Sequence, residues 1–216
     1  MATVTGLRQA SRRPARWTVE VDGEVVATLS SVEMGATGLF EGQSLSPDEL
    51  QTSLDRAFGE SARSLTLRYM SYRPRSIREL RSYLRRHGIP DGVVDREMER
   101  LETADLAGDV DFAAFWAENR TRFAPRGRMA LAHELRQKGV GRGDIEAGLA
   151  GLPSEEQLAY QAGLRKGRLL ASSDRDHFFQ AMHAFLRRRG FSGEVAFAAA
   201  KRLWDTAQQA DDPDDC

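Results

Sequence analysis

A step of 51 residues recurs along this chain and constrains its fold more than any other feature. Gly88, Gly139 and Gly190 stand 51 residues apart, and each follows a run that contains two or more basic residues. The same step links apolar positions: Leu80 with Leu131 and Met182, Leu84 with Leu135 and Leu186, Ile89 with Val140 and Phe191, and Leu101 with Leu152 and Leu203. Self-similarity at one fixed period predicts a tandem repeat, in which each unit buries its apolar face against its neighbours.

The first repeat is clearest over residues 72–101, which predict a turn, an amphipathic helix, a glycine break and a second helix. Ser76 and Glu79 have the spacing of a capping box at a helix start. The buried stripe of this helix is then formed by Ile77, Leu80, Tyr83 and Leu84. Gly88 lies where a helix commonly ends in a left-handed residue, so the helix should stop there.

The later repeats carry start signals of the same kind. The residues placed to cap further helices are Asp144, Ser154 with Gln157 in capping-box position, Asp174 and Ser192. Each repeat is therefore about three helices in about 50 residues, which is too small for a substantial core of its own. We predict a mainly α fold: an elongated array of three tandem three-helix repeats, preceded by a small N-terminal β-hairpin.

Apolar residues alternate on either side of Asp22-Gly23, which predicts a β-hairpin over residues 17–29. A two-residue turn would pair Val21 with Glu24 and split the apolar side chains between two faces. A three-residue connection instead pairs Val21 with Val25, Val19 with Ala27, and Trp17 with Leu29. All six apolar side chains then share one face, so burial favours this second register.

These signals divide the chain into six segments. They are a disordered basic tail (1–16), the hairpin with an irregular segment (17–45), helical repeat 1 (46–107), helical repeat 2 (108–153), helical repeat 3 (154–206) and an acidic disordered tail (207–216). Within repeat 1, Ser46 and Glu49 can form a capping box with Pro47 at the first helical position. We expect Gly59 to break the helix that comes after this cap.

The composition suits small helical units, because only 41% of the residues are hydrophobic and 29% are charged. The longest apolar stretches fall far short of the roughly 20 residues that a membrane span needs. No apolar region follows the N-terminus as it does in a secretion signal. The single cysteine, Cys216, cannot form an internal disulfide, which fits a reducing compartment. We therefore expect a cytoplasmic protein that does not contact a membrane.

Sequence motifs for catalysis are not found. No phosphate-cradling glycine loop and no dinucleotide-binding fingerprint occurs in the chain. Asp109 and Asp111 stand directly before Phe112, so we interpret them as helix caps rather than as a metal-binding pair. The four histidines lack the spacing of metal ligands. We expect no catalytic residue, no cofactor and no metal, and hence a protein that is not an enzyme.

Arginines recur at the middle helix of each repeat, although the net charge of the chain is only −1. Their planar forks suit carboxylates and phosphates alike. They either complement the helix dipole and keep the surface soluble, or they line up along the array as a binding surface. The candidate partner-binding residues are Arg73, Arg75, Arg85, Arg86, Arg126, Arg128, Arg187, Arg188 and Arg189.

Two of these basic runs resemble the RecX family. They are YRPRS at 72–76, followed by Glu79 and Leu80, and ELRQKGV at 134–140. The resemblance covers roughly residues 60–204 and implies three tandem three-helix repeats. A tyrosine that the family commonly has before the second repeat is missing from residues 103–109.

The resemblance implies a non-enzymatic regulator of the recombinase RecA, acting in recombination and the DNA-damage response. Such a protein binds RecA and its filament on DNA, and it damps ATP hydrolysis, strand exchange and co-protease activity. Its partners would be the RecA monomer and the RecA–DNA filament, with a weak direct contact to DNA left open, and the regulator itself would be a monomer. The alternative is a helix-turn-helix-like regulator that binds duplex DNA.

Overall fold

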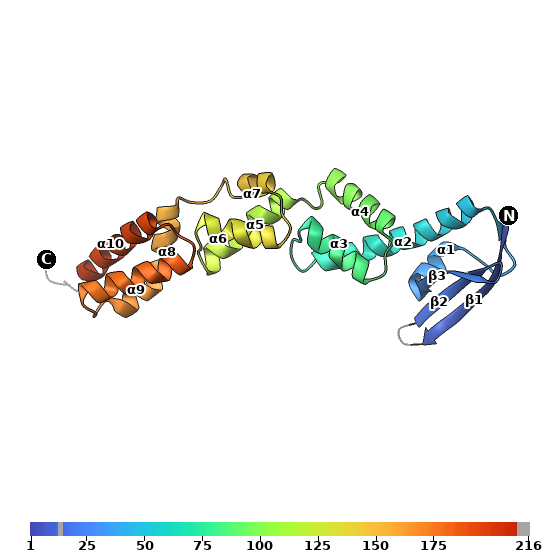
Figure 1. Cartoon of the computed structure of the whole chain (residues 1–216), viewed down its shortest axis with the longest axis horizontal. Helices are drawn as coiled ribbons and strands as arrows, with labels where there is room; N and C mark the ends of the chain where they lie inside the picture. Colours follow the sequence, from blue (N-terminus) through green and yellow to red (C-terminus); the bar gives the residue numbers. More distant parts are fainter. Residues whose placement is uncertain (13–14, 211–216) are drawn as a thin grey trace. The chain divides into compact units, whose positions relative to one another are not determined.

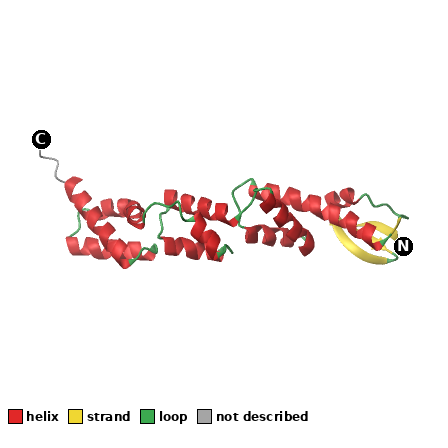
Figure 2. Cartoon of the chain, turned by 90° about the horizontal axis from the view of Figure 1, so that it is seen from above, coloured by secondary structure: helices red, strands yellow, loops and turns green. Residues whose placement is uncertain are grey.

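A computed structural model describes residues 1–12 and 15–210. All strands of the described part come from the first 45 residues (Figure 2): β1 (Ala2–Arg12), β2 (Ala15–Val21), β3 (Glu24–Ser30) and β4 (Ser44–Leu45). The helices in Figure 1 are α1 (Ser31–Thr37), α2 (Pro47–Met70), α3 (Ile77–Arg86), α4 (Asp91–Thr103), α5 (Asp109–Phe123), α6 (Arg128–Gln137), α7 (Arg142–Gly148), α8 (Glu155–Leu170), α9 (Arg175–Arg188) and α10 (Gly193–Ala210). None of these described helices is long and apolar enough to cross a membrane.

The chain divides into two compact units. The first contains residues 1–75 and 79–106, and the second contains residues 76–78 together with residues 107 onward. The sheet, α1, α2, most of α3 and α4 belong to the first unit, whereas α5 to α10 belong to the second. The predicted mainly helical fold of three-helix repeats behind a small β-region is therefore confirmed.

The N-terminal residues form a strand, so the predicted disorder over 1–16 is wrong. Strand β1 pairs antiparallel with β2 along its length, and the sheet has the order β3-β2-β1-β4. Val4 is buried against Val19 and Leu29 in the core under this sheet. A strand with one covered face needs only every second side chain to be apolar. The backbone hydrogen bonds between β1 and β2 supply the rest of the stabilisation. The sparse apolar residues of β1 were therefore enough.

The hairpin combines both of the turns that the sequence left in competition. At the tip Val21 lies opposite Glu24, so the predicted pairing of Val21 with Val25 is wrong. Asp22 and Gly23 both have positive φ, of 50° and 87°, as a two-residue turn of this hand requires. Further along, the predicted pairs of Val19 with Ala27 and Trp17 with Leu29 are present, because a register shift after Val19 takes up one residue.

Two helices in the first unit differ from the prediction. Helix α1 replaces part of the expected irregular segment, and it begins with a capping box between Ser30 and Glu33. Helix α2 starts with the predicted Ser46–Glu49 capping box but runs without a break through Gly59. Buried residues flank this glycine on both sides of α2, so tertiary packing outweighs the low helix propensity of glycine.

The repeat itself is confirmed by burial. Leu84, Leu135 and Leu186 are each 0% exposed, in the middle helices α3, α6 and α9. Gly88 and Gly139, which follow two of these helices, have φ values of 79° and 87° and so end them in the left-handed conformation. Separate cores form around α5–α7 and around α8–α10.

Most of the predicted caps are present in the later repeats. The side chains of Ser154, Asp174 and Ser192 accept hydrogen bonds from the backbone N–H groups three residues ahead, at 3.2, 2.9 and 3.2 Å. Asp144 was predicted wrongly as a cap, because Gly141 occupies that position and Asp144 lies in the first turn of α7. Helix α10 continues to Ala210, past the predicted repeat boundary, and the acidic residues 211–216 lie outside the described residues.

The repeat also extends to the packing between helices. Within the second unit, the Ser76 hydroxyl donates to the Lys138 carbonyl at 2.8 Å. One repeat later, the Gly127 N–H donates to the Arg189 carbonyl at 3.0 Å. Ser76 and Gly127 are 51 residues apart, and so are Lys138 and Arg189. The C-terminal end of one middle helix therefore lies against the start of the preceding one in the same way twice.

Candidate partner-binding surface

The nine predicted arginines fall into two classes, and the first holds the fold together. Arg73 donates from both terminal nitrogens to the Glu79 carboxylate, at 3.0 and 3.1 Å. Arg75 donates from Nε to the Tyr69 carbonyl at 3.2 Å and lies 3.8 Å from the centre of the Tyr69 ring. These two side chains fix the turn between α2 and α3, so they are not available as a free binding surface.

Arg126, Arg128 and Arg189 have the same structural role in the second unit. Arg128 donates to the carbonyls of Leu149 and Leu152, at 2.8 and 3.2 Å, and so holds the end of α7. Arg189 donates to the Pro125 carbonyl at 3.1 Å. Burial, and then the nearby charge of Arg126, lower the pKa of Arg189. These three arginines therefore already have partners within the fold, and their contact with a partner protein stays a prediction.

The second class is exposed and lies at the C-terminal ends of α3 and α9. Arg85 pairs with Asp91 at 2.7 Å while 55% of its side chain remains exposed. Within the described part of the chain, Arg86 and Arg187 bond only to backbone carbonyls close by in the sequence, at 3.3 and 3.1 Å. Arg188 makes no hydrogen bond or ion pair to any described residue. These four arginines remain candidates for contact with a partner.

An exposed arginine at the equivalent position of the second repeat was left out of the predicted set. Arg136 occupies the last turn of α6, and its Nε donates to the Ala132 carbonyl at 3.1 Å. It stands 51 residues after Arg85 and 51 before Arg187. The repeat step could have identified it, because the same position of all three middle helices is an arginine. We refer to Arg85, Arg136 and Arg187 as the helix-end arginines.

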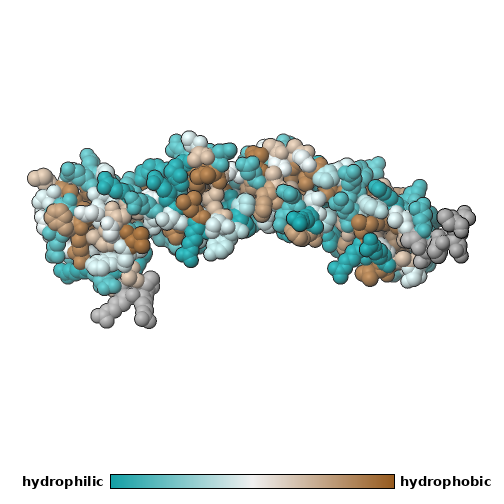
Figure 3. All heavy atoms as spheres, turned by 180° about the vertical axis from the view of Figure 1, so that it is seen from behind, coloured by the Kyte–Doolittle hydropathy of each residue, from teal (hydrophilic) through white to brown (hydrophobic). Residues whose placement is uncertain are grey.

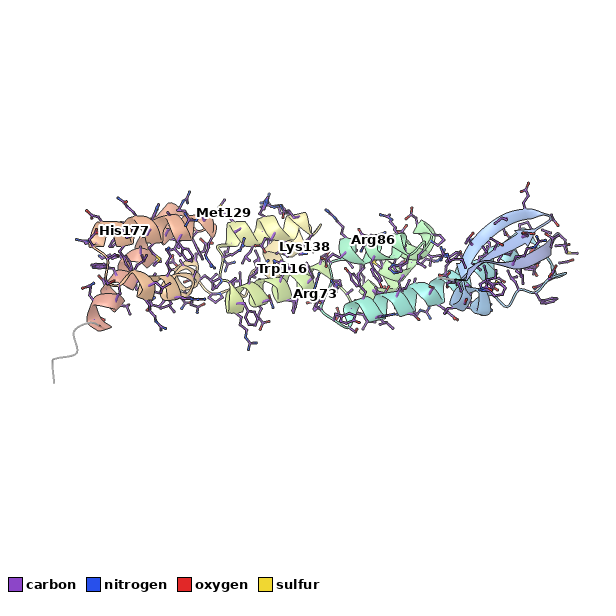
Figure 4. The ribbon with its side chains drawn as sticks, turned by 90° about the horizontal axis from the view of Figure 1, so that it is seen from below. Arg73, Arg86, Trp116, Met129, Lys138 and His177 are labelled. Atoms are coloured by element: carbon purple, nitrogen blue, oxygen red, sulfur yellow. The ribbon has the colours of Figure 1, made fainter. Side chains whose placement is uncertain are left out.

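The motif around Glu134 in α6 serves packing rather than contact with a partner. Glu134 Oε2 accepts from Trp116 Nε1 at 2.8 Å and from Arg120 Nε at 2.9 Å. Its other oxygen forms an ion pair with Arg126 at 2.9 Å that lacks hydrogen-bond geometry. The Lys138 ammonium lies 4.6 Å from the centre of the Trp116 ring, and Figure 4 shows the two side chains close together. Glu134 thereby joins α5 to α6.

The equivalent site of the first repeat uses different chemistry. Tyr69 and Tyr83 stand 51 residues before Arg120 and Glu134. Their rings stack in parallel with centroids 4.0 Å apart, where the second repeat has an ion pair. A stacked aromatic pair and a charged pair therefore join the same two helices in successive repeats. This exchange conceals the repeat at these positions in the sequence.

Two of the residues considered as metal ligands, Asp109 and His87, form hydrogen bonds with the backbone. Asp109 Oδ1 accepts from the Ile77 N–H at 2.9 Å, so it contributes to the start of α3 rather than capping its own helix. His87 Nδ1 donates to the Tyr83 carbonyl at 2.8 Å. Among the residues that the structure describes, no group of three or more histidine, cysteine or acidic side chains could hold a metal ion.

The surface offers no single large apolar site on the face seen in Figure 3, where hydrophilic residues are spread among apolar ones. Exposed apolar side chains do occur around the connection between α5 and α6, where Phe123 is 71% and Met129 is 77% exposed. Isolated exposed apolar residues are common on soluble proteins and do not define a site. The helix-end arginines are therefore the feature that recurs.

Comparison with known proteins assigns the family. Residues 62–101 match the first three-helix domain of RecX, and residues 109–149 match the second. The regulatory protein RecX of Lactobacillus delbrueckii subsp. bulgaricus is 30% identical over 214 residues, covering 97% of this chain and 78% of that protein. The regulatory protein RecX of Mycobacterium ulcerans is 39% identical over 143 residues, covering 63% of this chain and 81% of that protein.

Solved structures agree on the fold. A crystal structure of regulatory protein RecX has a TM-score of 0.60 at 22% identity, and covers 90% of this chain and 97% of its own. RecX from Lactobacillus salivarius has a TM-score of 0.60 at 19% identity, and covers 68% of this chain and 96% of its own. The sequence relatives, the matched domains and the shared fold agree, so this chain belongs to the RecX family of regulatory proteins.

Proposed function

We propose that this chain binds the recombinase RecA, as monomer and as filament on DNA, and damps its ATP hydrolysis, strand exchange and co-protease activity. Membership of a regulatory family supports this proposal. The observation that carries it is the arginine that recurs at one position of all three middle helices, Arg85, Arg136 and Arg187. The protein acts as a monomer in the cytoplasm and catalyses no reaction.

The local contacts of the helix-end arginines are weak enough to be exchanged for a partner. Arg85 pairs with Asp91, but both side chains are more than half exposed. Such surface pairs contribute only about 0–1 kcal/mol to stability. A carboxylate on RecA can therefore replace Asp91 at little cost to the fold. The guanidinium fork binds a carboxylate through two parallel hydrogen bonds, which adds direction to the attraction.

Repetition raises the affinity of such weak contacts. A RecA filament presents the same surface on successive subunits, and this chain presents the same arginine on successive repeats. Once one repeat is bound, the next meets its site at a high effective concentration. Binding to a filament should then be tighter than binding to a monomer. It should also weaken with salt, because exposed charges are screened.

The test is inhibition of RecA ATP hydrolysis by charge-reversed variants. Arg85→Glu/Arg86→Glu and Arg187→Glu/Arg188→Glu should each inhibit less than the native chain, because like charges then face the partner. Arg165→Glu/Arg168→Glu is the matched control, since it changes the same charge at exposed positions of α8. Circular dichroism should show that all three variants are folded.

Two results would contradict the proposal. Full inhibition by both helix-end variants would mean that these arginines are only solvated helix ends. Tight binding to naked duplex DNA without RecA at physiological salt would favour the alternative of a duplex-binding regulator. In that case affinity should fall steeply with salt, with a slope set by the number of phosphate contacts.

A further inference from the structure

Helices α2 and α4 of the first unit border an open groove of about 230 Å³. Its lining contains four arginines and three carboxylates. None of the four arginines belongs to the predicted partner-binding set or to the helix-end arginines. The groove is therefore a separate feature, and its role is independent of the proposed function.

Half of the arginines in this groove are already paired. Arg96 Nη2 contacts the Asp55 carboxylate at 2.6 Å. Arg100 donates twice to Glu97, at 2.8 and 2.8 Å, and the Glu97 side chain is only 5% exposed. These two ion pairs fix the α4 wall. The three remaining charged residues of the groove, Arg56, Glu60 and Arg63, all belong to α2.

The charged side chains of the α2 wall that have no protein partner among the described residues are exposed to solvent. Arg56 and Arg63 line the groove, are exposed and form no hydrogen bond or ion pair with any described residue. Glu60 lies between them on the same helix and is equally unpaired within the described part of the chain. Seven residues of helix place Arg56 and Arg63 about 10 Å apart along the groove. Side chains two residues apart in an extended chain share a face and are about 7 Å apart, a spacing that the long arginine side chains can reach from these positions.

Gly59 lies at the floor of the groove, although its helical backbone conformation does not require a glycine. Apart from its chain neighbours and the nearby backbone of its own helix, a Cβ atom at Gly59 would meet no atom of the described residues within 4 Å. Its helical conformation suits any residue, and glycine within a helix is less stable than alanine. Val93 opposite is 3% exposed and closes the floor with apolar surface. The space above Gly59 is thus left open at a cost in helix stability.

We propose that this groove binds an extended acidic segment of a partner protein. Carboxylates of the segment pair with Arg56 and Arg63, and a backbone N–H donates to Glu60. The mixed charge favours a peptide over a phosphate backbone, because phosphates facing Glu60 would repel its carboxylate and carry no donor for it. A peptide provides both acceptors for the arginines and donors for the carboxylate.

The test uses a fluorescein-labelled peptide of alternating aspartate and alanine, titrated with the full chain by fluorescence anisotropy. Arg56→Glu/Arg63→Glu should weaken binding about tenfold or more, since like charges then oppose each other across the interface. Gly59→Leu should weaken it comparably by filling the groove without changing its charge. Arg165→Glu/Arg168→Glu is the matched control, with the same charge change at exposed positions of α8, and should bind like the native chain. Circular dichroism checks the folding of each variant.

Each result that would contradict the proposal can be told apart from the others. Absence of saturable peptide binding by the native chain would overturn the proposal, as would native affinity in both groove variants. An equal loss in the Arg165→Glu/Arg168→Glu control would show that the peptide responds to general charge and not to the groove. Displacement of the peptide by a single-stranded oligonucleotide that binds the native chain but not the groove variants would assign the groove to nucleic acid instead.

Discussion

Replacing Gly88, Gly139 or Gly190 with alanine compares the packing around three positions that are equivalent in the repeat. All three glycines have positive φ, of 79°, 87° and 85°. Placing a Cβ in the left-handed region costs about 1–2 kcal/mol. This part of the cost should be nearly the same at all three positions, because the backbone conformation is the same.

The neighbours of the three glycines make the total cost unequal. Among the described residues, a Cβ at Gly88 would have only Arg16 Nη2 near it, at 3.8 Å. A Cβ at Gly139 would lie 2.7 Å from the Cβ of Arg78, and one at Gly190 would overlap the Cβ of Ala130. Such crowding adds about 1–3 kcal/mol. We therefore expect Gly88→Ala to cost about 1–2 kcal/mol and the other two about 2–5 kcal/mol.

Urea denaturation followed by helical circular dichroism measures these differences. Gly143→Ala is the matched control within α7, because its φ is not positive and a Cβ there meets nothing within 4 Å. This control should be neutral or slightly stabilising. A Gly88→Ala cost as large as that of Gly190→Ala would refute the reasoning, because backbone strain alone would then explain all three sites.

The core, the groove floor and a helix cap each give a further prediction. Leu135→Ala should cost about 2–5 kcal/mol in urea denaturation, because the leucine is 0% exposed, and a loss below about 1 kcal/mol would contradict its place in the core. Gly59→Ala should stabilise the first unit by about 0.5–1 kcal/mol in the same assay, and a destabilised variant would show that the groove floor is occupied. Hydrogen bonds from the backbone and hydroxyl of Ser46 hold the pKa of Glu49 below its ordinary value of 4.5. The ionised carboxylate therefore stabilises the fold above pH 4.5, and this contribution disappears as the pH falls through the lowered pKa. The stability deficit of Glu49→Gln, followed by thermal unfolding, should narrow on acidification, whereas a deficit independent of pH would exclude this capping role.

The helical part of the fold was predictable because its signals are local. Leucine spacing, capping residues such as Ser46 and Asp174, and a glycine at each helix end all act within a few residues of one another. The step of 51 residues then assigned Leu84, Leu135 and Leu186 to the same place in three units. Burial confirmed this assignment.

The N-terminal strand was not predictable on the same basis. Its stability depends on pairing with β2 and on Val4 entering a core formed by residues far away in the sequence. The hairpin tip was mispredicted because burial and turn geometry were treated as exclusive. The register shift after Val19 satisfies both.

The roles of the arginines could not be separated by sequence alone. Arg128 and Arg189 are held by carbonyl oxygens of Leu149, Leu152 and Pro125, and those contacts exist only in the folded chain. A half-buried arginine and an exposed one have the same letter in the sequence. Arg189 also lies at the same helix end as the exposed Arg187 and Arg188, so the dipole argument applied equally to all three.

Co-sedimentation with RecA filaments assembled on single-stranded DNA tests the central claim most directly. The native chain should pellet with the filaments and should remain in solution with DNA alone. Arg85→Glu/Arg86→Glu and Arg187→Glu/Arg188→Glu should pellet much less, while the α8 control Arg165→Glu/Arg168→Glu should pellet like the native chain. Equal pelleting of all variants, or pelleting of the native chain with DNA in the absence of RecA, would contradict the account.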